Sequence, residues 1–278
     1  MARNPVAALV LAATLSAAPD ALLAQASARM QASRQLGDES ELTVFVEFGR
    51  GEFELRPAEP GQLYRVQLRY DEEAYDPIHQ LSGSQLTVGV DGRDGPSRGS
   101  SSGELRLALS DRIPMDLDLE LGAVRTDIEL GGLRLRSLEL STGASETDLR
   151  VSTPNPVAMT SVEFEVGAAS FEATDLGRLN AETVTLEAGV GEVRLDFGGL
   201  QRPETRVSVE MGLGSLEIRI PSDVGIHLTR STFLVPLDAP GLVREGEADV
   251  SPGWEASPVK IYLSVEAAFG RLSVVRGN

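Results

Sequence analysis

Carboxylates are the side chains of this chain whose regular spacing could support chemistry. Seven copies of a short pattern each centre on one small residue, here called the marker: Gly49, Gly122, Gly143, Gly167, Gly189, Gly212 and Ala268. Two residues before the marker, six copies carry glutamate and one carries Ser141: Glu47, Glu120, Glu165, Glu187, Glu210 and Glu266. If the copies stack, these glutamates form a column on one outer face, and carboxylate oxygens suit Ca²⁺. The candidate metal ligands are therefore Glu120, Glu165, Glu187 and Glu210.

A solvated acidic face is the competing interpretation of the same residues. More carboxylates lie three or five residues after the markers: Glu52, Asp127, Glu146, Asp148, Glu172, Glu192 and Glu217. Charge of one sign keeps a β surface soluble and blocks pairing at sheet edges. The chain has no EF-hand loop and no glycine- and aspartate-rich nonapeptide. We therefore expect no dedicated cofactor, and calcium is the only candidate.

Other residue types that could do chemistry are scarce. The chain has two histidines, His79 in a predicted loop and His227 in a predicted strand, and no Gly-x-Ser-x-Gly sequence. The Gly-x-Gly pairs at Gly49, Gly189 and Gly212 lack a following lysine and a following helix pattern, so they indicate turns rather than phosphate loops. We predict no catalytic residue and no cofactor-binding residue.

The elements that must position the acids are short strands. Apolar residues alternate before each marker and return four and six residues after it, as in Val162, Phe164 and Val166 before Gly167. From Gly122 to Gly212 the markers step by 21, 24, 22 and 23 residues. This spacing predicts a strand, a bend and a second strand per copy, stacked as rungs of about 22 residues.

The predicted fold class is therefore all-β and solenoid-like, with atypical N- and C-terminal caps. The six marker glycines would lie at the bends, where a positive φ or a close approach between rungs excludes a side chain. The bend glycines are Gly49, Gly122, Gly143, Gly167, Gly189 and Gly212.

The two ends of the chain differ from the middle. Residues 1–26 resemble a secretory signal, with the apolar run Val6–Ala18 and a cleavage site at Ala24-Gln25-Ala26. We interpret residues 27–40 as a flexible linker, 41–112 as an N-terminal β region and 113–278 as the repeat region with its C-terminal cap, continuous with 41–112. Residues 91–103 form a polar loop, and the single tryptophan, Trp254, is expected to cover the last rung.

Composition limits the partners. Forty-two acidic and 25 basic residues give a net charge of −17, which argues against nucleic acid or an anionic membrane as partner. The chain has no cysteine, and hence no disulfide, thiolate metal site or lipid-modified cysteine. Outside residues 1–26 no apolar run is long enough to span a membrane. We expect a periplasmic or extracellular protein, soluble or peripherally associated with the cell surface.

Two runs near the C-terminus carry a family resemblance. One is Val207–Leu228, with a Gly-x-Gly turn before Pro-Ser-Asp-Val-Gly-Ile. The other is Gly241–Val275, with Trp254, Lys260-Ile-Tyr-Leu263 and Phe269-Gly-Arg-Leu272 in order. The chain resembles bacterial toast-rack and "putative adhesin" β-solenoid proteins over about residues 40–278, most clearly over 180–278. These are similar to the extracytoplasmic part of cell-wall-active antibiotic response proteins.

This resemblance implies an exported, non-enzymatic, adhesin-like or structural protein of the bacterial envelope, with a polysaccharide or protein ligand. A secretion signal in place of membrane helices argues against membrane signalling. One alternative is an extracellular polysaccharide-active enzyme of the β-helix kind, although aromatic residues, at 5%, offer few platforms for sugar rings. The other alternative is an envelope-stress sensing domain.

Overall fold

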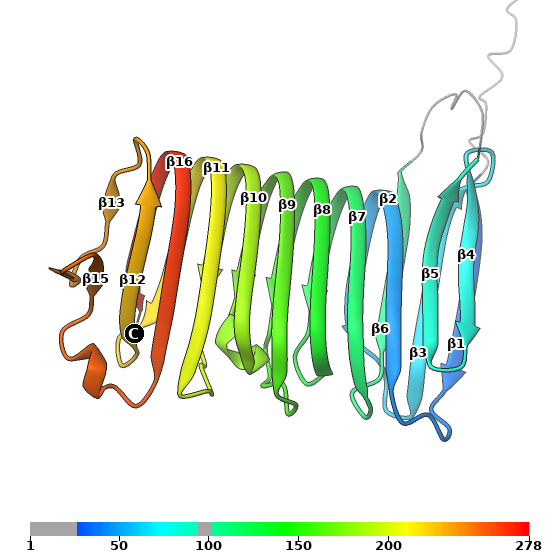
Figure 1. Cartoon of the computed structure of the whole chain (residues 1–278). Helices are drawn as coiled ribbons and strands as arrows, with labels where there is room; N and C mark the ends of the chain where they lie inside the picture. The colour runs from blue at the N-terminus through cyan, green and yellow to red at the C-terminus, as the bar shows by residue number, and fades with distance from the viewer. Residues whose placement is uncertain (1–26, 94–101, 278) are drawn as a thin grey trace, which may run out of the picture.

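The computed structural model describes residues 27–93 and 102–277 as one continuous β structure (Figure 1). Strands account for 72% of the chain and helices for 3%, which confirms the all-β, solenoid-like prediction. Sixteen strands of the described residues join a single sheet. The predicted signal peptide and its cleavage site, and residues 94–101 of the predicted polar loop, lie outside the described residues.

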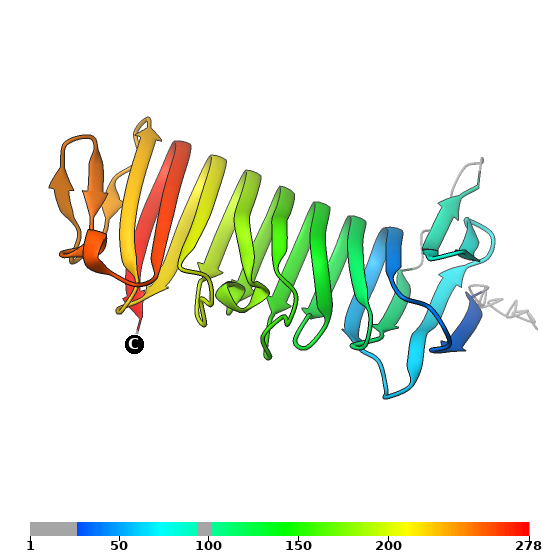
Figure 2. The same cartoon turned by 60° about the horizontal axis from the view of Figure 1, so that its bottom comes forward.

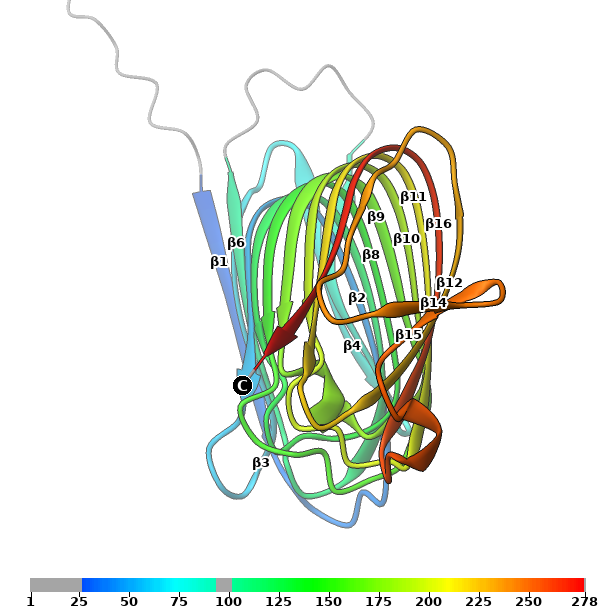
Figure 3. The same cartoon turned by 90° about the vertical axis from the view of Figure 1, so that its left-hand side faces the viewer.

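Seven long strands form the body of the stack. They pair in parallel, in this order: β2 (Leu42–Pro57), β7 (Pro114–Glu129), β8 (Arg134–Arg150), β9 (Met159–Thr174), β10 (Ala181–Asp196), β11 (Glu204–Pro221) and β16 (Lys260–Gly277). Each strand rises along one wall, bends in its middle and descends along the opposite wall (Figures 1 and 3). One long strand therefore contains both of the strands that the sequence predicts on either side of a marker.

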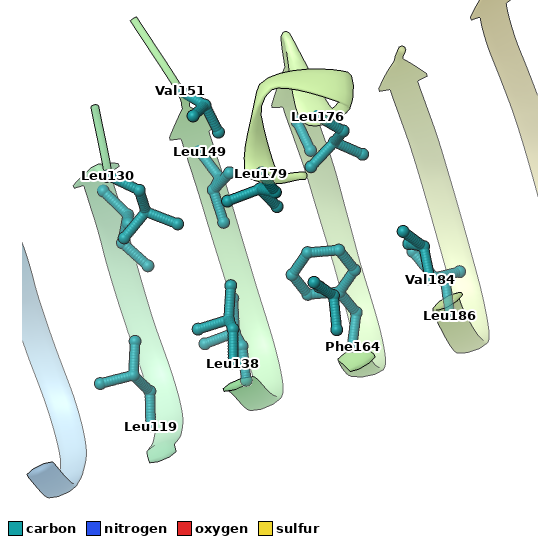
Figure 4. Packing of buried hydrophobic residues seen from close by; sticks show 14 of the residues in the cluster. Leu119, Leu130, Leu138, Leu149, Val151, Phe164, Leu176, Leu179, Val184 and Leu186 are labelled. Atoms are coloured by element: carbon teal, nitrogen blue, oxygen red, sulfur yellow. The ribbon is translucent and has the colours of Figure 1, made fainter. Parts of the chain in front are cut away.

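The core fills the space between the two walls. Alternate residues point inward, so β9 reads as buried at Val162, Phe164 and Val166 and exposed between them. The inward residues align from rung to rung, and Figure 4 shows Leu119, Phe164 and Leu186 in this order along the stack, with β8 between the first two. The Phe164 ring on the rising wall lies 5.1 Å from the Phe171 ring on the descending wall, measured between centroids. Side chains from both walls thus pack directly on each other.

Turns close the rungs at the end opposite the bends (Figure 2). Their apolar residues enter the core: Leu130, Leu133, Leu176, Leu179 and Phe197 are at most 1% exposed. One turn folds into the 3₁₀ helix η1 (Leu176–Leu179). Asn155 is buried beside it, and its side-chain amide donates to the carbonyl oxygens of Leu135 and Leu179, at 2.8 and 3.0 Å. This side chain links the start of β8, the turn that follows β8 and the 3₁₀ helix that follows β9.

The N-terminal cap corrects one interpretation from the sequence. Residues 27–40 are not a linker throughout, because Ser27–Gln35 form strand β1. β1 pairs antiparallel with β3 (Gln62–Asp71), and β3 pairs antiparallel with β6 (Gly103–Leu109). The alternation of β1 is weak, with Met30 and Ala32 only partly buried against the core. An edge strand buried on one side alone carries too faint a pattern to predict.

An incomplete rung precedes β2. The hairpin of β4 (Tyr75–Ser82) and β5 (Gln85–Gly92) places β5 beside the rising half of β2, and β6 lies beside the descending half. Together β5 and β6 continue the stack by one rung.

The C-terminal end does not follow the chain order. β16, which carries the seventh copy of the pattern, lies between β11 and β12 (Gly225–Thr232). Short strands complete this end: β13 (Leu237–Asp238), β14 (Val243–Glu245) and β15 (Ala248–Val250), followed by the 3₁₀ helix η2 (Trp254–Ala256). The last copy in the sequence is therefore an internal rung.

Trp254 lies elsewhere than predicted. Its ring packs against His227 of β12 and Tyr262 of β16, with centroids 4.8 and 6.0 Å away. Both partners alternate with buried residues and so project outward. The tryptophan covers the outer face near the end of the stack rather than the open end of the last rung.

Candidate functional site

The structure aligns the predicted glutamate column across neighbouring strands. Strand register places Glu47 opposite Glu120, Glu120 opposite Ser141, and Ser141 opposite Glu165. It continues through Glu187, Glu210 and Glu266 without a slip. Of the four candidate ligands, Glu165, Glu187 and Glu210 are consecutive neighbours, and Glu120 is separated from them by Ser141.

The column differs from several acids of the descending wall in its ion pairing. In the described residues no arginine or lysine forms an ion pair with any of its six glutamates. On the descending wall, by contrast, Glu146 pairs with Arg125 at 2.7 Å, Glu192 with Arg194, and Glu217 with Arg219 at 3.4 Å. The column is a row of exposed carboxylates whose charge the described part of the protein leaves uncompensated.

The marker glycines lie beside the column and contact each other between rungs. A Cβ on Gly189 would be 2.7 Å from the carbonyl oxygen of Gly167, and one on Gly212 would be 2.6 Å from that of Gly189. Neither distance is compatible with a side chain. Positive φ values occur two residues later instead, at 148° in Gly191 and 144° in Gly214. Close approach explains Gly189 and Gly212, the first glycines of their Gly-x-Gly pairs, and backbone conformation explains the second glycines, Gly191 and Gly214.

A groove runs along these glycines for the length of the stack. It is lined by the glutamate column, the next residue of each rung and the marker itself, and its volume is about 1270 Å³. Tyr75 and Val90 lie at one end, and Ser231 and Phe233 lie at the other. The markers have no side chain larger than one methyl group, so no long side chain fills the groove at their positions.

An exposed apolar ridge follows the groove on the side away from the glutamates. It consists of the residue after each marker from β7 onward, namely Ala123, Ala144, Ala168, Val190, Leu213 and Phe269. The last three are 51%, 49% and 47% exposed. Phe269 meets Phe233 edge-to-face at 5.7 Å, so the ridge and the groove join at the C-terminal end. This ridge was not predicted from the sequence, although the residue after the marker grows in size from copy to copy there.

A second acidic column lies two residues further down the rising wall. Asp118, Glu139 and Glu163 are opposite one another on β7, β8 and β9. Partial burial, and then the charge of Glu120, raises the pKa of Asp118. Loss of hydration, and then the carboxylates of Asp118 and Glu163, raises the pKa of Glu139. Both shifts have the sign expected for carboxylates held close to each other.

Neither column gathers its acids around a point. In residues 27–93 and 102–277, no group of three His, Asp or Glu side chains is arranged to hold a metal ion. Successive glutamates of a column lie one strand spacing apart, about 4.8 Å, and point in parallel. Calcium binding by Glu120, Glu165, Glu187 and Glu210 stays a prediction.

The two histidines lie outside the groove. His79 of β4 contacts the hydroxyl of Tyr64 through its Nε2 atom at 3.0 Å. His227 packs against the rings of Trp254 and Tyr262. Neither residue lines the groove. In the described ranges, no helix is long and apolar enough to cross a membrane.

Stacked parallel rungs with a shared core and capped ends define this protein as a β-solenoid-like repeat protein. A family model described as the N-terminal domain of toast_rack, DUF2154, matches residues 24–174. The chain belongs to this family, as its resemblance to toast-rack proteins implies. The match covers the N-terminal cap and the rungs through β9, and does not extend over 180–278, where we expected the clearest resemblance.

Solved structures of similar proteins come from bacteria. A "putative cell adhesion protein" from Clostridium sporogenes is 15% identical, with a TM-score of 0.46 and coverage of 91% of this chain and 100% of that one. A "putative adhesin" from Bacteroides fragilis is 10% identical, with a TM-score of 0.43 and coverage of 90% and 99%. A "putative lipid binding protein" from Parabacteroides distasonis is 9% identical, with a TM-score of 0.34 and coverage of 89% and 97%. A search of the curated proteins gave no match.

Proposed function

We propose that this is an exported, non-enzymatic, adhesin-like binding protein of the bacterial envelope, and that its ligand lies along the groove. The groove itself carries the proposal, because a glutamate lines it on six of the seven long strands. A site repeated along one direction suits an elongated ligand that makes the same contact several times. Catalysis needs unlike groups converging on one reacting atom, and neither histidine lines the groove.

Ligand binding can be tested with the purified full-length protein and isolated envelope material. We expect the protein to bind at least one of three preparations: cell wall, exopolysaccharide or envelope protein. Glu165→Lys with Glu187→Lys places two cations in the groove and should abolish that binding. The matched control is Asp148→Lys with Glu172→Lys, which changes the charge equally on the descending wall, outside the groove. Equal binding by both double variants, or no binding to any preparation, would contradict the proposal.

Two further measurements test the non-enzymatic role and the export of the protein. After incubation with polysaccharide fractions we expect no new reducing ends, and their release would instead support a polysaccharide-active enzyme. When cells produce the full chain, we expect the protein outside the cytoplasm with Ser27 as its first residue. Recovery of an intact Met1 in the cytoplasm would contradict export.

A further inference from the structure

We propose that the groove and the apolar ridge together bind a basic amphipathic segment of a partner protein. This inference names the ligand class of the groove and therefore rests on the proposed function. The bound segment needs a row of cationic side chains to face the glutamate column and a row of apolar side chains to face the ridge.

The requirement for cationic side chains comes from the glutamate column, which forms no ion pair with the described residues. Glu165, Glu187, Glu210 and Glu266 lie opposite one another on four consecutive rungs. Like charges directly opposite in a sheet destabilise it, and no cation of the described residues forms an ion pair with any of them. Lysine or arginine side chains in the groove would relieve that repulsion in addition to pairing with each carboxylate.

The apolar requirement comes from exposure. Val190, Leu213 and Phe269 are in register on β10, β11 and β16, and about half of each side chain is exposed to solvent. Beyond them, Phe233 and Leu234 are 64% and 70% exposed. A continuous apolar patch of this kind is typical of an interaction site. Its side chains grow from alanine to phenylalanine along the same rungs that carry consecutive glutamates.

The distance between the two rows determines the shape of the ligand. Column and ridge are three residues apart along each strand, about 10 Å, with the bare glycine between them. A segment in the groove would therefore face carboxylates on one side and apolar side chains on the other. The groove crosses nine strands, from β5 to β12, which is about 38 Å at ~4.8 Å per step. About 11 extended residues span that length.

Charge selects this ligand over other occupants of an apolar face. A second copy of the chain would bring its own glutamate column against this one, and each copy has a net charge of −17. An anionic membrane would be repelled for the same reason. A neutral polysaccharide would leave the carboxylates without a counter-charge. A basic amphipathic polypeptide complements both rows.

The test uses the full-length protein and labelled 12-residue peptides in a fluorescence anisotropy titration at low salt. The probe alternates lysine and leucine, and the control peptides alternate lysine with serine and glutamate with leucine. The ridge variant is Val190→Ser with Leu213→Ser, and the column variant is Glu187→Gln with Glu210→Gln. Their controls are Val243→Ser, an equally exposed apolar residue on β14, and Asp148→Asn with Glu172→Gln. Circular dichroism melting verifies that each variant is folded.

We expect the lysine–leucine peptide to bind most tightly. Both groove variants should weaken its binding, each by roughly tenfold or more, and neither control should. Equal binding of the lysine–serine peptide, or equal loss in the control variants, would show charge attraction alone and overturn the inference. A dimer that the ridge variant abolishes, or ridge-dependent binding to phosphatidylcholine vesicles, would also overturn it in favour of a second copy or a membrane. If envelope fractions bind through the column but no peptide binds, the proposed function survives and this inference fails.

Discussion

The marker residue at each bend shapes the groove between the glutamate column and the apolar ridge. A marker glycine allows neighbouring rungs to approach, and its missing side chain leaves a groove between a carboxylate and an apolar residue. The Gly189 position shows the constraint directly, since a Cβ there would lie 2.7 Å from the Gly167 carbonyl oxygen. The seventh copy carries Ala268 instead, at an internal rung where one methyl group is accommodated.

A glycine substitution tests this packing. Gly189→Ala should lower the free energy of unfolding by about 1–3 kcal/mol, because the methyl group forces two rungs apart. Gly49→Ala should change it by less than about 0.5 kcal/mol, since no described atom lies within 4 Å of the added Cβ. Urea denaturation measures both. Equal stability of the two variants would show that the close approach is relaxed without cost.

The pKa of Glu139 gives a second prediction at the residue scale. Because this pKa is raised in the folded protein, the folded protein binds the Glu139 proton more tightly than the unfolded chain does. Stability therefore falls as pH rises through the folded pKa. Glu139→Gln removes the ionisation and should stabilise the protein at pH 7 by a few tenths of a kcal/mol. The gain should vanish below the ordinary glutamate pKa of 4.5. Glu172→Gln serves as the control in urea melts from pH 3.5 to 7, and a pH-independent gain would contradict the assignment.

At the scale of elements, the turns opposite the bends hold the rungs in register. The strands themselves could slide by two residues and still present apolar side chains to the core. Specific polar contacts in the turns oppose that slip. Asn155 is 1% exposed and bonds to main-chain atoms of Leu135, Val157 and Leu179. Such a buried side chain is costly to leave unpaired and is therefore specific for one register.

Removal of Asn155 tests the role of the turns. Asn155→Ala leaves two buried carbonyl oxygens and one amide without this partner, and should lower the free energy of unfolding by about 2–4 kcal/mol. Ser152→Ala removes an exposed hydroxyl bond to Glu129 in the same turn and should cost less than about 1 kcal/mol. Chemical denaturation followed by circular dichroism compares them. A loss no larger in Asn155→Ala than in Ser152→Ala would assign the register to the strands alone.

At the scale of the whole molecule, charge is the dominant feature. The net charge of −17 combines with the glutamate column, which runs the length of the stack and forms no ion pair with any residue that the structure describes. Self-repulsion of this kind destabilises the compact state and is screened by salt. The same charge opposes the association of two copies, which would leave the exposed ridge available to another partner.

Salt separates general screening from a cation site. We expect the melting temperature to rise between low and physiological sodium chloride. Millimolar calcium chloride should raise it no more than sodium chloride of equal ionic strength, because the carboxylates of the column do not converge. Differential scanning calorimetry measures the shift. A larger effect of calcium that disappears in Glu165→Gln with Glu187→Gln would establish the column as a calcium site.

The sequence by itself determined the rung, because alternation and spacing are local properties repeated along the chain. It predicted the all-β stack, and the register of the structure aligns its glutamates in a column. Only the tertiary structure decided which segments pair: Ser27–Gln35 as an edge strand, β5 with β6 as one incomplete rung, and β16 between β11 and β12. The physical reason is that main-chain hydrogen bonds between strands carry no residue code, so distant partners leave little trace in a local pattern. The groove and its ridge follow from that pairing, since they exist only where the rungs lie side by side.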